Sequence, residues 1–543
     1  TVEMVKTILD PVDKMDGDSL PVSAFVDHAD GTFELGASAY EKRGVSAFVP
    51  EWTAETCAQC NQCAFVCPHA TIRPFALNEE EAAAAPENAN LVDFRAGKGK
   101  GLYKYTMAIS PLDCMGCGVC VNICPTKSLK MVGLESQEDK QPVFDYMVSK
   151  VSEKPEVKND TVIGSQFKQP YLEFSGSCAG CAETSYARLV TQLFGERMYI
   201  SNATGCSSIW GGSAPATPYT VNTATGHGPA WANSLFEDNA EHGLGIYLGQ
   251  KTIRERVIGY VKELREQVSD DEKKAVIDTF LATKDNGAEN TAAADALIKM
   301  LESCDCKNEL KDKILAEKDY LAKKSVWIFG GDGWAYDIGF GGLDHVLASG
   351  EDINVMVFDT EVYSNTGGQS SKATPTGAVA QFAAGGKETK KKDMASIAMS
   401  YGYVYVAQIA MGADYNQAVK AIAEAEAYPG PSLIIAYAPC INHGIKKGMS
   451  KAQTEEQLAV QTGYWHCFRF NPALAAEGKS AFTLDSKAPS GDYQEFLNGE
   501  VRYNSLKRAN PAKAERLFGK NEQEAKDRYT YLNKLVKLYG SEE

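Results

Sequence analysis

The chain has 543 residues, enough for roughly two to four domains, and 44% of them are hydrophobic. Its net charge of −16 argues against a nucleic-acid-binding surface, and the absence of any run of about 18 apolar residues excludes a membrane-spanning helix. Fifteen cysteines without a secretory segment indicate cofactor ligands in a reducing compartment, for which we expect the cytoplasm. Because the chain begins at Thr1, we expect a processed chain or part of a longer one.

We divide the sequence into four parts. Residues 1–48 mix short apolar runs with turns and are expected to form a small linking segment. Residues 49–155 hold two cysteine-rich runs. Residues 156–499 alternate β-rich apolar runs with helical patterns, interrupted at 250–323 by a charged, exposed helical insertion. Residues 500–543 have the composition of a helical tail with mixed charges, which suits an interaction arm.

The third part predicts an α/β fold. Its apolar runs predict strands at 325–329, 353–358, 403–409 and 432–438, and a helical stretch at 416–427 separates two of them. Strands that alternate with helices predict a doubly wound, mostly parallel sheet covered on both faces. Ligands on such sheets bind beyond the carboxyl ends of the strands.

The two cysteine runs are copies of one pattern, C-x2-C-x2-C-x3-C-P, and together predict a ferredoxin-like α+β domain with two [4Fe–4S] clusters. The fourth cysteine of such a run ligates the other cluster. Disulfides or two zinc sites are the alternatives, but zinc ligands usually come as separated C-x2-C pairs. The ligands are Cys57, Cys60, Cys63 and Cys67 in the first run, and Cys114, Cys117, Cys120 and Cys124 in the second.

A Gly-Asp-Gly sequence follows the first predicted strand and precedes a helix. Asp332 would present a carboxylate there, and the second strand ends at Thr360. Magnesium prefers oxygen ligands, and the Asp332 carboxylate, the Thr360 hydroxyl and the Val362 carbonyl would supply three of them. The spacing resembles the thiamine diphosphate motif, although the usual second ligand is asparagine. An ordinary strand-to-helix turn is the alternative interpretation.

A further set of cysteines lies in glycine-rich or strand-end segments. Another [4Fe–4S] cluster fits this set, although a redox-active or zinc-binding C-x2-C pair stays possible, as does a buried free cysteine at Cys440. For Cys304, Cys306 and Cys467 we expect no cofactor role. The set consists of Cys178, Cys181, Cys206 and Cys440.

Taken together, these motifs resemble pyruvate:ferredoxin (flavodoxin) oxidoreductase along nearly the whole chain. The segments that carry the resemblance, besides the two cysteine runs, are 176–184, 203–208, 330–339, 359–369 and 438–440. The resemblance implies the carboxy-terminal half of such an enzyme, with three [4Fe–4S] clusters, thiamine diphosphate and Mg²⁺. Threonine at 360 in place of asparagine matches this family.

The resemblance also assigns roles to individual residues. Cys178, Cys181, Cys206 and Cys440 would ligate the cluster nearest thiamine, and Asp332, Thr360 and Val362 would hold magnesium. Glu183 and Cys206 would line the cofactor pocket, to which Gly333 and Trp334 also contribute. Asn365 would face the substrate as a catalytic residue.

The implied activity is oxidative decarboxylation of pyruvate to acetyl-CoA and CO₂, with single electrons passing through the clusters to ferredoxin or flavodoxin. Nothing in the sequence resembles the family's amino-terminal pyrimidine-binding domain or its coenzyme A domain, so we expect these as partners, in a homodimer of the full enzyme. The alternatives are an oxidoreductase for another 2-oxoacid and a non-catalytic electron-transfer subunit.

Overall fold

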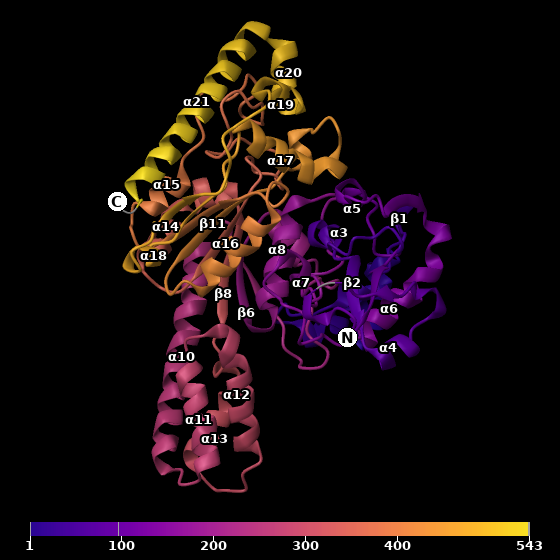
Figure 1. Cartoon of the computed structure of the whole chain (residues 1–543), viewed down its shortest axis with the longest axis vertical. Coiled ribbons are helices and arrows are strands. Elements are labelled where there is room, and N and C mark those ends of the chain that lie inside the picture. Colours follow the sequence, from indigo (N-terminus) through magenta and orange to yellow (C-terminus); the bar gives the residue numbers. More distant parts are fainter. Residues whose placement is uncertain (1, 96, 541–543) are drawn as a thin grey trace.

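A computed structural model describes residues 2–95 and 97–540 (Figure 1). Its centre is an eight-stranded sheet with the strand order β13-β12-β10-β11-β9-β8-β6-β7. Strands β6 to β11 run parallel, and β12 and β13 extend one edge antiparallel. The strands are β6 (Met198–Ala203), β7 (Ala230–Ser234), β8 (Ser325–Gly331), β9 (Asn354–Asp359), β10 (Tyr405–Ile409), β11 (Ser432–Tyr437), β12 (Phe468–Phe470) and β13 (Phe482–Leu484). The four predicted strands are β8 to β11, and the predicted α/β class is confirmed.

Both faces of the sheet are buried, because successive side chains of a strand point to opposite sides. In β9, Val355 and Val357 belong to one core cluster, whereas Met356 and Phe358 belong to another. Helices α14, α15 and the carboxy-terminal helices cover the first face, and α8, α9 and α16 cover the second. The helices are α8 (Ala182–Phe194), α9 (Cys206–Gly211), α14 (Phe340–Ala348), α15 (Met394–Met399), α16 (Tyr415–Ala427), α17 (Ala452–Thr462), α18 (Ala473–Ala476) and α19 (Tyr493–Asn498).

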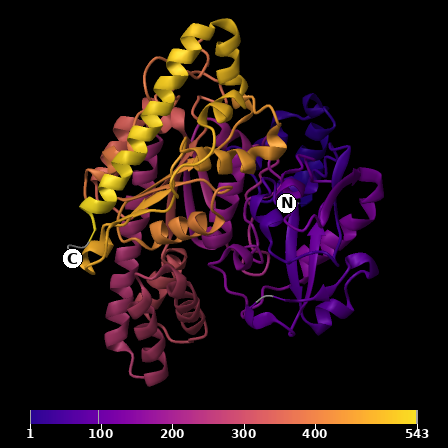
Figure 2. The ribbon, with the colours of Figure 1, turned by 45° about the horizontal axis from the view of Figure 1, so that its top comes forward.

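A helical projection leaves the sheet between β7 and β8 (Figures 1 and 2). It consists of α10 (Asn239–Gln267), α11 (Asp271–Thr283), α12 (Gly287–Glu302) and α13 (Glu309–Ala316), which share a core of their own. Helix α10 begins before the predicted insertion at 250–323, because its first turns cover the sheet. A side chain at Gly243 would meet Ile328 at 2.5 Å, so glycine permits this close approach. The projection also carries a Cys304–Cys306 disulfide.

The cysteine-rich part forms two small antiparallel sheets. One pairs β1 (Phe48–Trp52) with β5 (Leu129–Gly133), and the other joins β2 (Ile72–Leu77), β4 (Lys104–Ile109) and β3 (Val92–Asp93). Phe65, Val66 and Val119 belong to the second core cluster of the large sheet, so this part packs against α8. Its helices are α3 (Gln62–Val66), α4 (Glu79–Ala83), α5 (Val119–Ile123) and α6 (Gln141–Lys150), and α7 (Val162–Ser165) follows.

The two ends of the described chain pack on the rest of the molecule. Near the amino end, α1 (Val2–Met4) and α2 (Asp10–Asp13) flank a short helix whose apolar side chains cluster with Ala37 and Ala216. At the carboxyl end, α20 (Val501–Ala509) leads into α21 (Pro511–Leu538), which lies along the sheet (Figure 1). Helix α21 buries Leu517, Phe518, Leu532 and Leu535 in the first core cluster. The helices predicted as an interaction arm therefore pack against the sheet instead.

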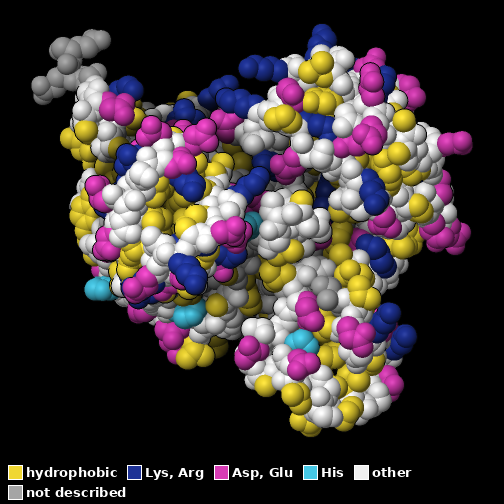
Figure 3. All heavy atoms as spheres, turned by 90° about the horizontal axis from the view of Figure 1, so that it is seen from below, with side chains coloured by type: hydrophobic (Ala, Val, Ile, Leu, Met, Phe, Trp, Pro, Cys, Tyr) yellow, Lys and Arg dark blue, Asp and Glu magenta, His cyan; other side chains and the backbone are white. Residues whose placement is uncertain are grey.

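The surface mixes both signs of charge, and acidic and basic side chains lie side by side on the face shown in Figure 3. Among the described residues, every helix is too short or too polar to cross a membrane.

Candidate active site

The two cysteine runs share a backbone conformation as well as a spacing. Each run passes through left-handed residues at matching positions, namely Gln59, Asn61 and Ala70 in the first and Gly116, Gly118 and Lys127 in the second. In both, an amide N–H two residues after the first cysteine lies 3.4 Å from that cysteine's Sγ. Hydrogen bonds to sulfur are among the factors that set the potential of an iron–sulfur cluster.

The fourth cysteine of each run lies with the first three of the other run. Burial raises the pKa of the Cys63 thiol well above its usual value, and Cys124 from the second run raises it further. Cys120 shows the reciprocal arrangement, since burial and then Cys117 raise its pKa, followed by Cys67 from the first run. Buried thiolates need cations beside them, and the irons of two interlocked clusters would supply the positive charge.

The third set of cysteines meets around one cavity of about 120 Å³. Helix α8 begins after Cys181, α9 begins at Cys206, and Cys440 follows the end of β11. These elements meet because parallel strands carry their carboxyl ends to the same edge of the sheet. Burial raises the pKa of Cys440 to about 12, so its thiolate also requires a cation. The cavity is lined by Cys178, Cys181, Glu183, Cys206, Thr360, Ser364, Asn365 and Cys440, among others.

The three oxygen atoms predicted to bind magnesium lie together at the ends of β8 and β9. Thr360 Oγ1 is 3.0 Å from Asp332 Oδ1 and 3.0 Å from the Val362 carbonyl oxygen. Magnesium–oxygen bonds of about 2.0–2.1 Å place neighbouring octahedral ligands about 3.0 Å apart, so both separations fit. Burial raises the pKa of Asp332 well above its usual value, and the Asp359 carboxylate raises it further, so a dication would stabilise the ionised form.

The other predicted pocket residues lie in different environments. Glu183 is 5% exposed, burial raises its pKa to about 7, and Trp210 Nε1 donates to its Oε2 at 2.8 Å. Asn365 lines the cavity from an exposed loop. At Gly333 a side chain would collide with the Tyr363 ring at 2.4 Å. Trp334, in contrast, is fully buried in the first core cluster and packs against glycines, so its indole serves the core.

One of the two ferredoxin-like cysteine groups lies next to the third set of cysteines. Burial raises the pKa of Cys117 to about 11, while the N–H of Gly180, between two cysteines of the third set, acts in the opposite direction. His69 Nε2 also reaches across, to the Ser177 carbonyl at 3.2 Å. The group formed by Cys114, Cys117, Cys120 and Cys67 therefore stands next to the cavity.

Sequence reasoning missed the residues behind the metal ligands. His443 Nε2 donates to the Thr360 carbonyl at 2.6 Å, three residues after Cys440. Burial alone would raise the pKa of Glu361, but Lys391 and Arg502 lower it to about 2. These partners come from distant segments, and only the cluster of charged residues around 387–393 hinted at a role.

Comparison with protein families identifies the two cofactor regions. Residues 314–436 match the thiamine pyrophosphate enzyme, C-terminal TPP binding domain, and residues 56–128 match a 4Fe-4S dicluster domain. Residues 1–46 match a domain of unknown function. Thiamine diphosphate, with magnesium as its usual partner, and [4Fe–4S] clusters are thus confirmed as the cofactors of this chain. The individual ligands of all the clusters and of magnesium stay predictions.

The full sequence gives a closer match. It is 55% identical over 536 residues to a pyruvate-flavodoxin oxidoreductase from Klebsiella pneumoniae, covering 98% of this chain and 45% of the relative. The pyruvate:ferredoxin oxidoreductase of Moorella thermoacetica is 53% identical over 543 residues, again 98% of this chain and 46% of the relative. The chain is similar to these oxidoreductases over nearly its whole length. This confirms the resemblance seen in the sequence.

A third relative differs in name and length. The mitochondrial pyruvate dehydrogenase [NADP(+)] of Euglena gracilis is 47% identical over 521 residues, covering 95% of this chain and 28% of the relative. This chain spans about half the length of the first two relatives, and less of the third.

Proposed function

We propose that the chain is the cofactor-bearing half of an enzyme that oxidatively decarboxylates pyruvate to acetyl-CoA and CO₂ and passes electrons singly to ferredoxin or flavodoxin. The cavity that joins Cys178, Cys181, Cys206 and Cys440 to Glu183, Thr360 and Asn365 carries this proposal. An oxidation that exports single electrons needs a one-electron group beside the reacting carbon. The names of the Klebsiella and Moorella relatives support pyruvate and these acceptors.

The residues of the chain divide the work. When bound, thiamine diphosphate supplies the carbanion that attacks a 2-oxoacid and the ring that acts as an electron sink. Asp332, Thr360 and Val362 hold its magnesium-bound diphosphate end. Glu183, whose pKa is about 7, exchanges a proton at the cavity wall near neutral pH, while the Asn365 amide orients the substrate at the exposed side.

This chain matches only about half the length of its relatives, which supports the need for further domains to complete the enzyme. We assign to them a pyrimidine-binding domain and a coenzyme A domain on the amino-terminal side, in a full enzyme that forms a homodimer. Twelve cluster cysteines must stay reduced, which favours the cytoplasm. The Euglena relative is instead named for NADP⁺.

A substrate screen on the complete assembly, with methyl viologen as acceptor, tests the proposal. Pyruvate should give the fastest reduction, whereas faster reduction with 2-oxoglutarate or an indolepyruvate-type acid would identify another 2-oxoacid. Failure to bind thiamine diphosphate with magnesium would favour the electron-transfer subunit. Residues 1–543 alone should carry electrons from dithionite to ferredoxin, and pyruvate-dependent reduction by this chain alone would contradict the need for the other half.

A further inference from the structure

The turn that carries two of the predicted magnesium ligands has an unusual conformation. Glu361, between Thr360 and Val362, has φ +61° and is 1% exposed. A glutamate in the left-handed region is uncommon, and such a residue persists only where its surroundings fix it. The conformation brings Thr360 Oγ1 and the Val362 carbonyl, two residues apart, within 3.0 Å of each other.

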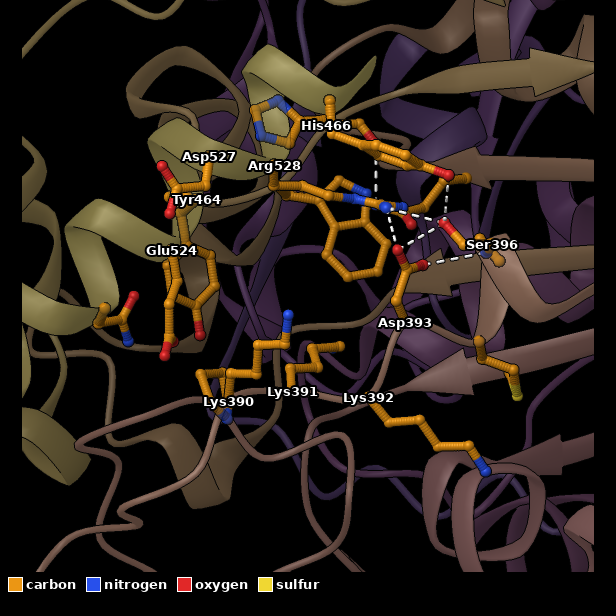
Figure 4. Close-up of a pocket in the computed structure, with 18 of the residues that line it drawn as sticks. Lys390, Lys391, Lys392, Asp393, Ser396, Tyr464, His466, Glu524, Asp527 and Arg528 are labelled. Atoms are coloured by element: carbon orange, nitrogen blue, oxygen red, sulfur yellow. Dashed lines mark hydrogen bonds and ion pairs between the residues drawn. The ribbon is translucent and has the colours of Figure 1, made fainter. Parts of the chain in front are cut away.

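Three donors from three separate segments hold the Glu361 carboxylate. Arg502 Nη2, at the start of α20, lies 2.7 Å from Oε2, and the Tyr464 hydroxyl lies 2.6 Å from the same atom. Lys391 Nζ, from the loop before α15, lies 3.1 Å from Oε1. Lys391 and Tyr464 also line a cavity of about 520 Å³ (Figure 4).

The residue on the other side of Thr360 shares one of these donors. Lys391 Nζ is 2.7 Å from Asp359 Oδ2, and the Tyr336 hydroxyl donates to the same oxygen at 2.9 Å. The amide N–H of Glu361 donates to Asp359 Oδ1 at 3.1 Å. One ammonium group therefore fixes both neighbours of Thr360, and the threonine has little freedom to turn.

The charges of this group leave a net negative balance. Arg502 Nε also pairs with Glu500 at 2.7 Å, so two cations face three carboxylates. An excess of buried negative charge favours a bound dication at the adjoining oxygen atoms. The group consists of Lys391, Arg502, Asp359, Glu361 and Glu500.

We propose that Glu361 is a positioning residue for the metal site, an inference that rests on the proposed magnesium-diphosphate function. Its clamped carboxylate holds the left-handed turn, so that Thr360 Oγ1 and the Val362 carbonyl face Asp332. Glu361 itself touches neither the metal nor the cofactor. Its role is to keep two ligands in place before the dication arrives, which lowers the cost of binding.

Glu361→Gln tests the proposal, because glutamine keeps the size of the side chain and removes its charge. Binding of Mg²⁺ together with thiamine diphosphate is measured by calorimetry on the complete, cluster-loaded assembly. We expect affinity to fall by at least about tenfold and to be restored at raised Mg²⁺. The electron paramagnetic resonance signals of the ferredoxin-like clusters should be retained. Unchanged affinity, even with a lower melting temperature, would show a merely structural role and overturn the proposal.

A matched pair of milder variants tests the same contact if the glutamine variant does not fold. Tyr464 and Tyr503 place their hydroxyls 2.8 Å apart in the same buried site, but only Tyr464 donates to Glu361. Tyr464→Phe should weaken Mg²⁺ binding by about threefold, and Tyr503→Phe should leave it unchanged. Equal effects in the two variants would overturn the proposal. Absence of magnesium-dependent thiamine diphosphate binding in the unmodified complete assembly would instead refute the magnesium-diphosphate function itself.

Discussion

The two cofactor regions of this chain are encoded in different ways. The predicted ligands of the ferredoxin-like clusters come from two short repeats, and the fourth cysteine of each repeat lies with the first three of the other. The ligands predicted around the cavity beside the predicted metal site come from separate segments of the α/β part, and Cys440 lies far along the chain from Cys206. Ligands of the first kind are visible as a spacing, whereas ligands of the second kind meet only because the sheet is parallel.

The regions also stabilise left-handed residues by different means. In the second cysteine run, two of the matching positions are occupied by Gly116 and Gly118, which adopt this conformation at little cost. The metal turn uses Glu361, which is held by charged side chains from remote segments. The cluster loops therefore depend on local sequence, and the metal turn depends on the completed tertiary structure.

Asp332→Ala should give the largest separation of the two regions. Removal of this buried carboxylate takes away a charged ligand, so we expect magnesium-dependent thiamine diphosphate binding to fall at least about 100-fold, since even outer partners of metal ligands cost about 10–100-fold. Calorimetry measures the loss, and the signals of the ferredoxin-like clusters serve as the folding control. Normal affinity in this variant would move the metal site elsewhere.

Cys440→Ser should remove one cluster and spare the other two. Serine is a poorer ligand for iron than thiolate, so iron should fall from about twelve to about eight atoms per anaerobically purified chain. In the full assembly, pyruvate-dependent reduction of ferredoxin should slow by orders of magnitude. Cys467→Ser is the control, because Cys467 is also a buried free cysteine. Three intact cluster signals in the Cys440 variant would contradict the ligand assignment. The substitution would then only lower the free energy of unfolding, by about 1–3 kcal/mol for an unpaired buried hydroxyl.

Cys67→Ser tests the crossing within the ferredoxin-like region. Because Cys67 lies with Cys114, Cys117 and Cys120, the altered signal should belong to the cluster of the second run. Electron paramagnetic resonance of the reduced protein, compared with Cys114→Ser, identifies which cluster changes. The two variants should perturb the same signal, and perturbation of different signals would refute the interlocked arrangement.

Glu456→Gln should have the smallest effect and should appear in the pH dependence of stability. Burial raises the pKa of Glu456 to about 8, while Gly412 N–H and the Tyr186 hydroxyl donate to it. The folded state binds this proton more tightly than the unfolded state, whose pKa is about 4.5. The stabilisation is complete below that value and is lost as the pH rises through about 8.

Glutamine does not titrate, so the variant should not show this loss. Between about pH 6 and pH 8 its melting temperature should fall roughly 2–4 °C less than that of the unmodified chain. Thermal melts at matched ionic strength measure the difference. Parallel pH profiles would show that Glu456 does not titrate in this range.

Much of the fold and cluster chemistry followed from the sequence because the determining distances are short. The spacing of the cysteines within each run indicates a cluster site directly. Apolar runs that end near Asp332 and Thr360 place both residues at the same edge of a parallel sheet. The packing of α21 was less evident, since its charged residues suggested exposure. Leu517, Phe518, Leu532 and Leu535 nevertheless recur at helical spacing on one side.

The clamp around Glu361 was not predictable in the same way. In a sequence, a lysine in the run 390–392 or an arginine in a charged helix indicates solvent exposure. Lys391 and Arg502 are instead paired with buried carboxylates. Such pairs are favourable only when all members are assembled, and no local pattern records that condition. The burial of the Trp334 indole was not predictable either, and its contribution to the cofactor pocket stays a prediction.

His443 links the predicted site of one cofactor to the predicted site of the other. It lies three residues after Cys440 and donates to the Thr360 carbonyl at 2.6 Å, so it joins the loop of the predicted iron ligand directly to the turn of the predicted magnesium ligand. Binding free energies linked in this manner are reciprocal, and loading either group changes the affinity for the other by the same factor. Loss of the predicted cluster should therefore change the affinity for thiamine diphosphate, and the size of that change measures the coupling.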